Sequence, residues 1–193
     1  MFLFKPKKPE EEKKPEVSQA NIDLGIITNM NQEFAVSLEL RDTLNTALKV
    51  IIGRINAQAA NIFLINDQKK KFECIASINQ DYLDEYELDL TDGVMAKAVQ
   101  QKKCIRVGNV RKDVREIAEF YFDLDNKTNF TTYSVLCSPL IAANECIGVI
   151  HCLNKKTDDK LFIEEDRTLL ETLSAPAALA IRNAKMAKEM VEK

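Results

Sequence analysis

Apolar residues recur along this chain at two different spacings, and the change from one to the other separates helices from strands. A stripe at helical spacing runs through residues 40–55, and Ser37 stands before it as a candidate N-cap. A second stripe predicts a long helix from Ile163 onward, kinked at Pro176 because proline lacks a backbone N–H. The stripes comprise Leu40, Leu44, Leu48, Ile51 and Ile55, and Leu170, Leu173, Ala177, Ala180, Ala184, Ala187 and Val191.

Between these two helices the pattern is typical of strands. Ile62 and Phe63 point to opposite faces of the first strand and are both apolar, which indicates a sheet covered on both sides. Strands are predicted at residues 59–66, 71–78, 104–107, 134–141 and 145–153, short helices at 94–102 and around 114–121, and a loop at 79–91. The order predicts an α/β (α+β) fold, with a central antiparallel sheet sandwiched between helices and the long N- and C-terminal helices packed together.

The N-terminal region has a different composition. Residues 5–16 read KPKKPEEEKKPE and contain no apolar residue, so residues 1–16 are predicted to be a disordered charged segment. Residues 17–36 carry a seam at Ala20, Leu24, Ile27, Asn31 and Phe34, which predicts a signalling helix that packs on a partner helix. Residues 37–193 are expected to form one domain that includes the C-terminal helix.

Composition narrows the possible functions. The chain has 193 residues, with 27 Lys+Arg against 30 Asp+Glu, and this net charge of -3 argues against nucleic-acid binding. The longest apolar runs are too short for a membrane span, so we expect no membrane partner and a cytoplasmic protein. The five cysteines contain no C-x-x-C pair and are interpreted as small buried residues.

Motifs for catalysis are missing from the sequence. It contains no phosphate-binding glycine loop, no nucleophile elbow and one histidine, so we expect no catalytic residues, no metal and no cofactor. This pattern is typical of a binding or signalling unit.

One segment carries a family resemblance. Residues 125–156 read DNKTNFTTYSVLCSPLIAANECIGVIHCLNKK and resemble GAF domains, most of all those of cyclic-nucleotide phosphodiesterases. Those domains carry D-x-x-T-G-F-x-T-R-x-(I/V)-L-C-x-P-(I/L), then I-G-V, then N-K. Asn129 stands in place of the glycine and Tyr133 in place of the arginine. The matching positions are Asp125, Thr128, Phe130, Thr132, Val135, Leu136, Cys137, Pro139, Leu140, Ile147, Gly148, Val149, Asn154 and Lys155. The resemblance extends from about Leu38 to Ala187 and implies the GAF fold.

The resemblance also implies a ligand site. Asp125, Thr128 and Thr132 match positions that face the purine and the phosphate in nucleotide-binding GAF domains. Asn61 and Ser77 match by their places on the first two strands, and His151 falls where those domains have a glutamate. The implied ligand is a small molecule, with cAMP and cGMP as candidates. Helix starts near Gly93 or Thr128 are expected to offer N–H groups to the phosphate.

Each of these residues also has a plain structural interpretation. Asp125 and Thr128 fit turn and N-cap chemistry in a polar loop. His151 fits a hydrogen-bonded core residue that shares one strand face with Ile147, Val149 and Leu153. The family's N-K…F-x-x-x-D-E motif appears as Asn154, Lys155, Phe162 and Asp166, with Arg167 in the last place, and implies a structural ion pair between Lys155 and Asp166.

Three functional hypotheses follow. The first is a regulatory sensor in which a ligand orders residues 92–132 and shifts the terminal helices of a homodimer, acting on a separate output protein or domain. The second is a ligand-free dimerisation module, which a pocket filled by Phe120, Tyr121 and Phe122 would favour. The third is an enzyme or redox sensor, and the cysteine spacing does not resemble the GAF subfamilies of that kind.

Overall fold

The computed structural model describes residues 40–80, 87–91 and 93–191, with side chains described from Leu44 to Met186 within those ranges. The expectations for residues 1–16 and 17–36, and the candidate cap at Ser37, lie outside the described residues. None of the described helices is both long enough and apolar enough to cross a membrane.

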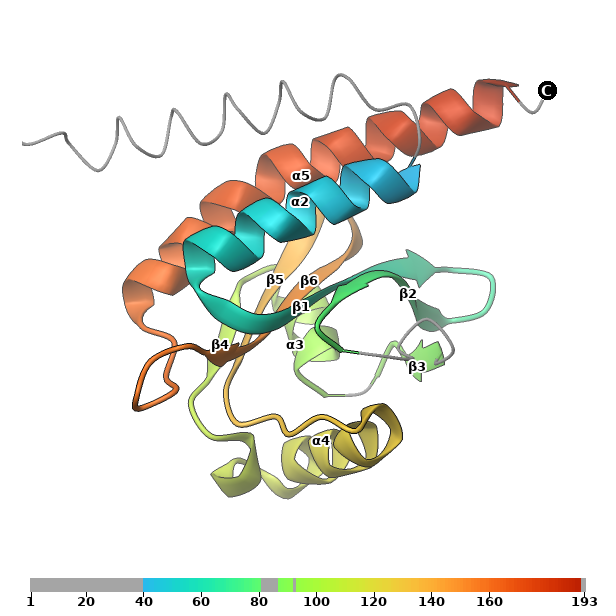
Figure 1. The fold of residues 1–193 in the computed structure, drawn as a ribbon. Helices are drawn as coiled ribbons and strands as arrows, with labels where there is room; N and C mark the ends of the chain where they lie inside the picture. Colours follow the sequence, from blue (N-terminus) through green and yellow to red (C-terminus); the bar gives the residue numbers. More distant parts are fainter. Residues whose placement is uncertain (1–39, 81–86, 92, 192–193) are drawn as a thin grey trace, which may run out of the picture.

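A six-stranded antiparallel sheet forms the centre of the molecule, with strand order β3-β2-β1-β6-β5-β4. The fold is the expected α+β sandwich, because helices lie on both sides of this sheet (Figure 1). The strands are β1 (Ala57–Asn66), β2 (Lys71–Ile78), β3 (Glu87–Asp89), β4 (Ile105–Val107), β5 (Val135–Ala142) and β6 (Glu145–Lys155). The helices are α2 (Leu40–Ile55), α3 (Gly93–Gln101), the 3₁₀ turn η2 (Val110–Lys112), α4 (Arg115–Thr128) and α5 (Glu164–Val191).

Helices α2 and α5 lie side by side on one face of the sheet (Figure 1). The predicted stripe of α2 is buried against it, with Leu44, Leu48, Ile51 and Ile55 fully inaccessible to solvent. The α5 stripe is buried in the same cluster at Leu170, Leu173 and Ala177, and Ala184 further along the stripe is also buried. The α5 stripe was expected to help join two chains. The buried part of it packs inside one chain, against β5 and α2.

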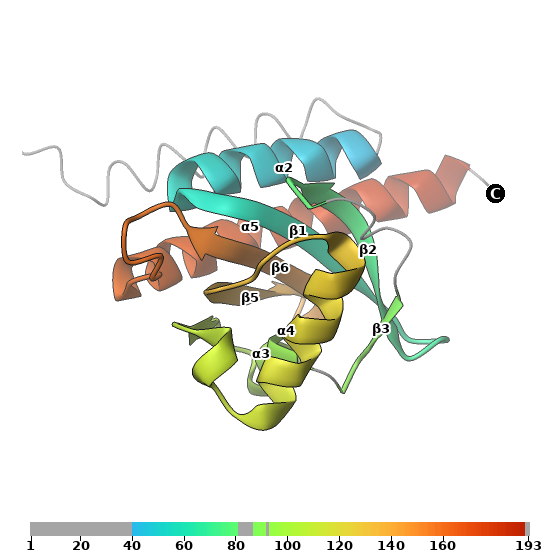
Figure 2. The same cartoon turned by 60° about the horizontal axis from the view of Figure 1, so that its bottom comes forward.

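Helices α3 and α4 cover the opposite face, and α4 lies below the strands in Figure 1 and toward the viewer in Figure 2. The sequence-based prediction was wrong about the end of α4, because residues 125–128 are helical rather than loop. Asn129 then ends the helix in the left-handed conformation, with φ 49°, and its N–H donates to the carbonyl of Asp125. This conformation favours glycine and tolerates asparagine, which accounts for the glycine at the matching place in the family motif.

Two further details depart from the prediction. Strand β3 lies in the expected loop 79–91, where charged residues at an edge strand hide the alternation of apolar positions. The register of β5 and β6 shifts between Leu140 and Ile141, which leaves Ile147 as the extra residue of a bulge. Ile147 therefore packs on the α2/α5 side, whereas Val149 and Leu153 face α3 and α4. Helix α5 runs without interruption through Pro176, the position at which the sequence predicts a kink.

Candidate ligand site between the sheet and helix α4

A row of three polar side chains crosses the sheet on the face that α4 covers. Asn61 of β1 pairs with Ser77 of β2 on one side and with His151 of β6 on the other. Asn61 and His151 are fully buried, although the same face is otherwise formed by apolar residues such as Phe63 and Val149. The alternation of strands β1 and β6 directs these polar side chains toward α4.

Helix α4 meets this row through a short hydrogen-bonded chain. The Ser77 hydroxyl donates to Asn61 Oδ1 over 2.7 Å, and Asn61 Nδ2 donates to Gln80 Oε1 over 2.8 Å. Gln80 Nε2 then donates to the Thr128 hydroxyl oxygen over 3.1 Å, in the last turn of α4. The chain joins three of the predicted site residues. Sequence reasoning missed Gln80, because a single glutamine in a polar loop gives no sign that it is buried.

His151 and Tyr121 form a second contact between the sheet and α4. Their rings are stacked, with centroids 5.7 Å apart, and the Tyr121 hydroxyl lies 2.7 Å from His151 Nε2. The Phe63 ring stands edge-on to the imidazole, 6.0 Å away. Burial lowers the pKa of His151 to about 3, so the imidazole is neutral near pH 7. Burial also raises the pKa of the Tyr121 phenol well above its ordinary value.

The aromatic residues expected to fill a pocket behave differently from one another. Tyr121 is fully buried and occupies the space over His151. Phe120 is half-buried and packs edge-on against Tyr121, with ring centroids 5.1 Å apart. Phe122 is 57% exposed and points away from the sheet, so Tyr121 alone fills this space as the ligand-free hypothesis requires.

Asp125 lies between Tyr121 and Thr128 on the inner side of α4 and is nearly fully buried. Its Oδ1 accepts from the Thr132 hydroxyl over 2.6 Å, and its Oδ2 accepts from the Thr132 N–H over 2.8 Å and pairs with Arg111. Burial raises the pKa of this carboxyl, and the Thr132 bonds and the Arg111 charge oppose that shift. The six predicted residues thus gather in one layer between the sheet and α4.

Only one of the two positions proposed as helix starts for phosphate binding begins a helix. Thr128 ends α4 rather than beginning a helix, and its hydroxyl donates to the Leu124 carbonyl over 2.8 Å. The carbonyl end of a helix is its negative end, so Thr128 offers no N–H cluster to a phosphate. Gly93 does open α3, with φ +66°, but a Cβ there would lie 2.9 Å from the Phe120 ring. Phe120 therefore packs directly on this helix start.

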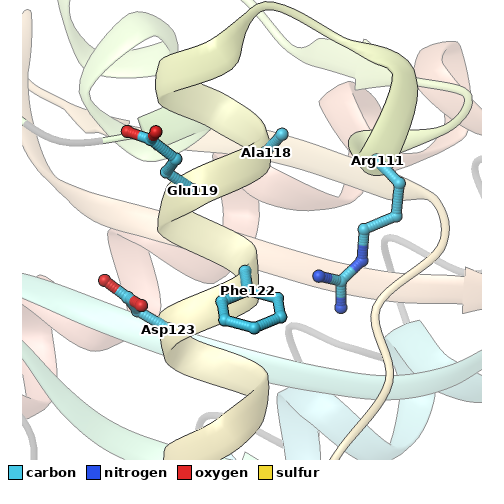
Figure 3. Close-up of a pocket in the computed structure, with 5 residues that line it drawn as sticks. All are labelled: Arg111, Ala118, Glu119, Phe122 and Asp123. Atoms are coloured by element: carbon cyan, nitrogen blue, oxygen red, sulfur yellow. The ribbon is translucent and has the colours of Figure 1, made fainter.

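Arg111, which sequence reasoning missed, connects the buried site to the outer surface of α4. Its guanidinium pairs with Asp125 and also lies 5.7 Å from the centroid of the exposed Phe122 ring. Figure 3 shows Arg111 and Phe122 side by side at a surface hollow of about 400 Å³, which Ala118, Glu119 and Asp123 complete. None of the six predicted site residues lines this hollow.

The expected ion pair is present at the other side of the sheet. Lys155 Nζ lies 2.6 Å from Asp166 Oδ1 and also donates to the Ile55 carbonyl over 2.7 Å. Asp166 Oδ2 accepts from the Ile163 N–H just before α5. The pair therefore joins the end of α2, the end of β6 and the start of α5, which is an architectural role.

Within the part of the chain that the structure describes, no group of three or more His, Cys, Asp or Glu side chains is arranged to hold a metal ion. The five cysteines are free thiols, and all but Cys146 are buried, as their interpretation as small core residues predicted.

Comparison with known proteins agrees with this architecture. The sequence model of the GAF domain matches residues 37–182. The probable 3′,5′-cyclic phosphodiesterase pde-5 of Caenorhabditis elegans is 24% identical over 143 residues, which cover 68% of this chain and 19% of that protein. The chain thus spans about a fifth of this relative's length.

Solved structures show the same fold. The GAF domain of a phosphoenolpyruvate-protein phosphotransferase from Coxiella burnetii superposes with a TM-score of 0.72 at 17% identity, covering 89% of this chain and 99% of that one. A free methionine-R-sulfoxide reductase from Neisseria meningitidis superposes with a TM-score of 0.67 at 14% identity, covering 89% and 95%. At such identities the likeness concerns the fold alone. Because the family match covers well over half of the chain, this protein belongs to the GAF family.

Proposed function

We propose that this GAF domain is a regulatory sensor that binds a small ligand between the sheet and α4, with the cyclic nucleotides cAMP and cGMP as candidate ligands. The observation that carries the proposal is the buried row Ser77, Asn61 and His151 on a face that is otherwise apolar. Burying polar groups is unfavourable for stability unless each is paired, so an apolar core would be simpler to build. The similarity to a cyclic-nucleotide phosphodiesterase supports this ligand class.

The side chains of the site suit a purine. Phe63 and Tyr121 offer aromatic surfaces, and the amides of Asn61 and Gln80 with the Thr128 hydroxyl offer donors and acceptors for the edges of a base. Tyr121 covers His151, so a ligand ring must enter beside this stacked pair, and its entry would displace α4. Such a displacement regulates an output only if the ligand binds the two positions of α4 unequally.

Isothermal titration of the full chain with cAMP and with cGMP tests the proposal. We expect heat of binding for one of them, and weaker binding in Asn61→Ala, which removes the centre of the polar row. Asn183→Ala is the matched control, because Asn183 is exposed on α5, far from the row in sequence and on the opposite side of the sheet. Absence of heat with both nucleotides at millimolar concentration would eliminate the cyclic-nucleotide version.

A second function is favoured by one observation. Tyr121 already fills the space over His151, as a ligand-free dimerisation or interaction module would require. In that version the terminal helices join two copies and a separate output protein or domain responds to the dimer. Sedimentation equilibrium of the full chain, with and without each nucleotide, distinguishes the two, since only the sensor changes its behaviour on adding the ligand.

We infer no catalytic function for the cysteines, although a structural neighbour is a reductase. Burial raises the pKa of Cys104 to about 12 and also raises the pKa of Cys137 and Cys152 well above the ordinary value. The thiolate is the reactive form, so these thiols are inert near pH 7. A reductase assay tests this inference. We expect the original chain and a variant with all cysteines replaced by serine to show the same background activity.

A further inference from the structure

His151 and Tyr121 together hold one more hydrogen-bond donor than the described residues satisfy. His151 Nε2 and the Tyr121 hydroxyl are paired with each other over 2.7 Å, and both residues are fully buried. His151 Nδ1 is the one buried side-chain nitrogen or oxygen without a partner among the described residues. The neighbouring Asn61 amide does not fill the gap: its Nδ2 donates to Gln80, its Oδ1 accepts from Ser77, and neither atom bonds Nδ1.

The number of unpaired donors is the same for both possible arrangements of the protons. A neutral imidazole has one N–H and a phenol has one O–H, so the pair carries two donor protons and makes one mutual bond. If the phenol donates to Nε2, the N–H on Nδ1 is left over. If Nε2 donates to the phenol oxygen, the O–H of Tyr121 is left over. In each arrangement a buried proton lacks an acceptor.

An unpaired buried donor destabilises a fold and is rare in native proteins. Phe63, Val149 and Leu153 around the imidazole have apolar side chains, so a molecule that enters this layer can supply the acceptor. No acceptor in that group of residues competes for the proton. The pair thus has a buried proton to offer to an acceptor atom of a ligand.

We propose that the His151–Tyr121 pair selects a ligand that presents a hydrogen-bond acceptor to it, such as a carbonyl oxygen or an unprotonated ring nitrogen of a purine. The inference rests on the proposed ligand-binding function and adds which ligand atom the site recognises. His151 acts as a specificity-determining residue in this view, and Tyr121 positions it through the shared hydrogen bond and the stacked rings.

The single histidine of the chain makes the proposal directly measurable. Untagged full-length protein labelled with ¹⁵N-histidine gives the two nitrogen signals of His151 alone. We expect a neutral imidazole with one protonated nitrogen in the free protein. Saturation with the nucleotide that binds in the calorimeter, cGMP or cAMP, should move the chemical shift of the protonated His151 nitrogen, or of its bonded proton, in the direction of a stronger hydrogen bond.

Two substitutions separate donation from packing. His151→Leu removes both nitrogens and leaves an apolar side chain, but it also removes the partner of the buried Tyr121 hydroxyl, so we expect some loss of stability in a domain that still folds. We expect nucleotide affinity to fall by about 10-fold or more in this variant. His151→Gln is the matched control, because its amide restores a donor, and most of the affinity should return. Thermal unfolding of both variants checks that the domain is folded.

The outcomes separate this inference from the proposed function. A nucleotide that binds while the His151 signals stay unchanged, or that binds His151→Leu as tightly as the original chain, would overturn the inference and leave the sensor function standing. Absence of binding of both nucleotides to the original chain would overturn the two together. A histidine shift combined with loss in His151→Leu and recovery in His151→Gln would establish the donor pair.

Discussion

The two faces of the sheet differ in what they bury. The face under α2 and α5 is packed mostly with aliphatic side chains; its buried Ser174 hydroxyl bonds a carbonyl of its own helix, and the Lys155–Asp166 ion pair stands at its edge. The face under α3 and α4 carries Ser77, Asn61 and His151 in a row, with Asp125, Thr128 and Thr132 opposite or beside it. The two sides of one sheet thus combine an apolar support with a polar layer.

We infer from this difference that the two faces have separate roles. Non-directional apolar packing stabilises a fold whatever its exact partners, whereas buried polar groups require specific partners. We therefore expect packing under the long helices α2 and α5 to contribute most to stability, and changes under α3 and α4 to affect ligand binding more. Each prediction below tests this division, from the largest expected effect to the smallest.

Leu173→Ala should have the largest effect. Leu173 is fully buried between α5 and the sheet, so the substitution leaves a cavity and should lower the free energy of unfolding by about 2–5 kcal/mol. Leu179→Ala in the same helix is the control, because Leu179 is 52% exposed and its loss should change stability by less than about 0.5 kcal/mol. Urea denaturation measures both. If folded Leu173→Ala bound nucleotide much less tightly, the division between the faces would be wrong.

Gly148→Ala should disturb both faces at once. A Cβ at this position would collide with the Phe63 carbonyl oxygen and lie 3.0 Å from Leu64 Cα, so β1 and β6 must move apart. We expect a loss of about 1–3 kcal/mol, together with weaker nucleotide binding because Asn61 and His151 sit on these two strands. Gly53→Ala is the opposite case, since no heavy atom from outside the adjoining α2 backbone lies within 4 Å of the new Cβ. It should raise stability by about 0.5–1 kcal/mol.

The pH dependence of stability reports on the polar face. The folded chain keeps His151 neutral down to a pKa of about 3, while the unfolded chain protonates it near its ordinary value. Protons therefore bind the unfolded state more strongly, and stability should fall by about 2 kcal/mol between about pH 7 and about pH 5. His151→Gln removes this contribution but leaves other titrating groups, so the two pH profiles should diverge over that interval. Parallel profiles would mean that the imidazole is accessible to protons in the folded chain.

Asn129 should give the smallest effect. Its left-handed φ of 49° at the end of α4 suits glycine, so Asn129→Gly should change stability by no more than about 0.5 kcal/mol. Asn129→Ala should be destabilising by about 1 kcal/mol, because a Cβ without a polar group is disfavoured there. Thermal unfolding measures both. A stabilising alanine would show that α4 does not need this cap.

Much of the fold was predictable from spacing alone. The buried stripe of α2 and the strand pair β1–β2 follow from the periods of their apolar residues. The edge strand β3 escaped prediction because one leucine between two acidic residues is too short a run to establish alternation, and the end of α4 escaped because polar helix turns resemble loops. Family resemblance supplied the six candidate residues, which periodicity could only have described as buried or exposed.

The sequence by itself determined the order of the elements, the face that each one buries and the family to which the domain belongs, because these depend on local periodicity and on motifs of neighbouring residues. Only the tertiary structure decided that Tyr121 stacks on His151, 30 positions away, and that Gln80 reaches Thr128, 48 positions away. The physical reason is that a period tells which side of an element is buried but not which buried polar group it meets. Which polar groups meet depends on how α4 packs across the strands. The unpaired proton of the His151–Tyr121 pair results from this packing.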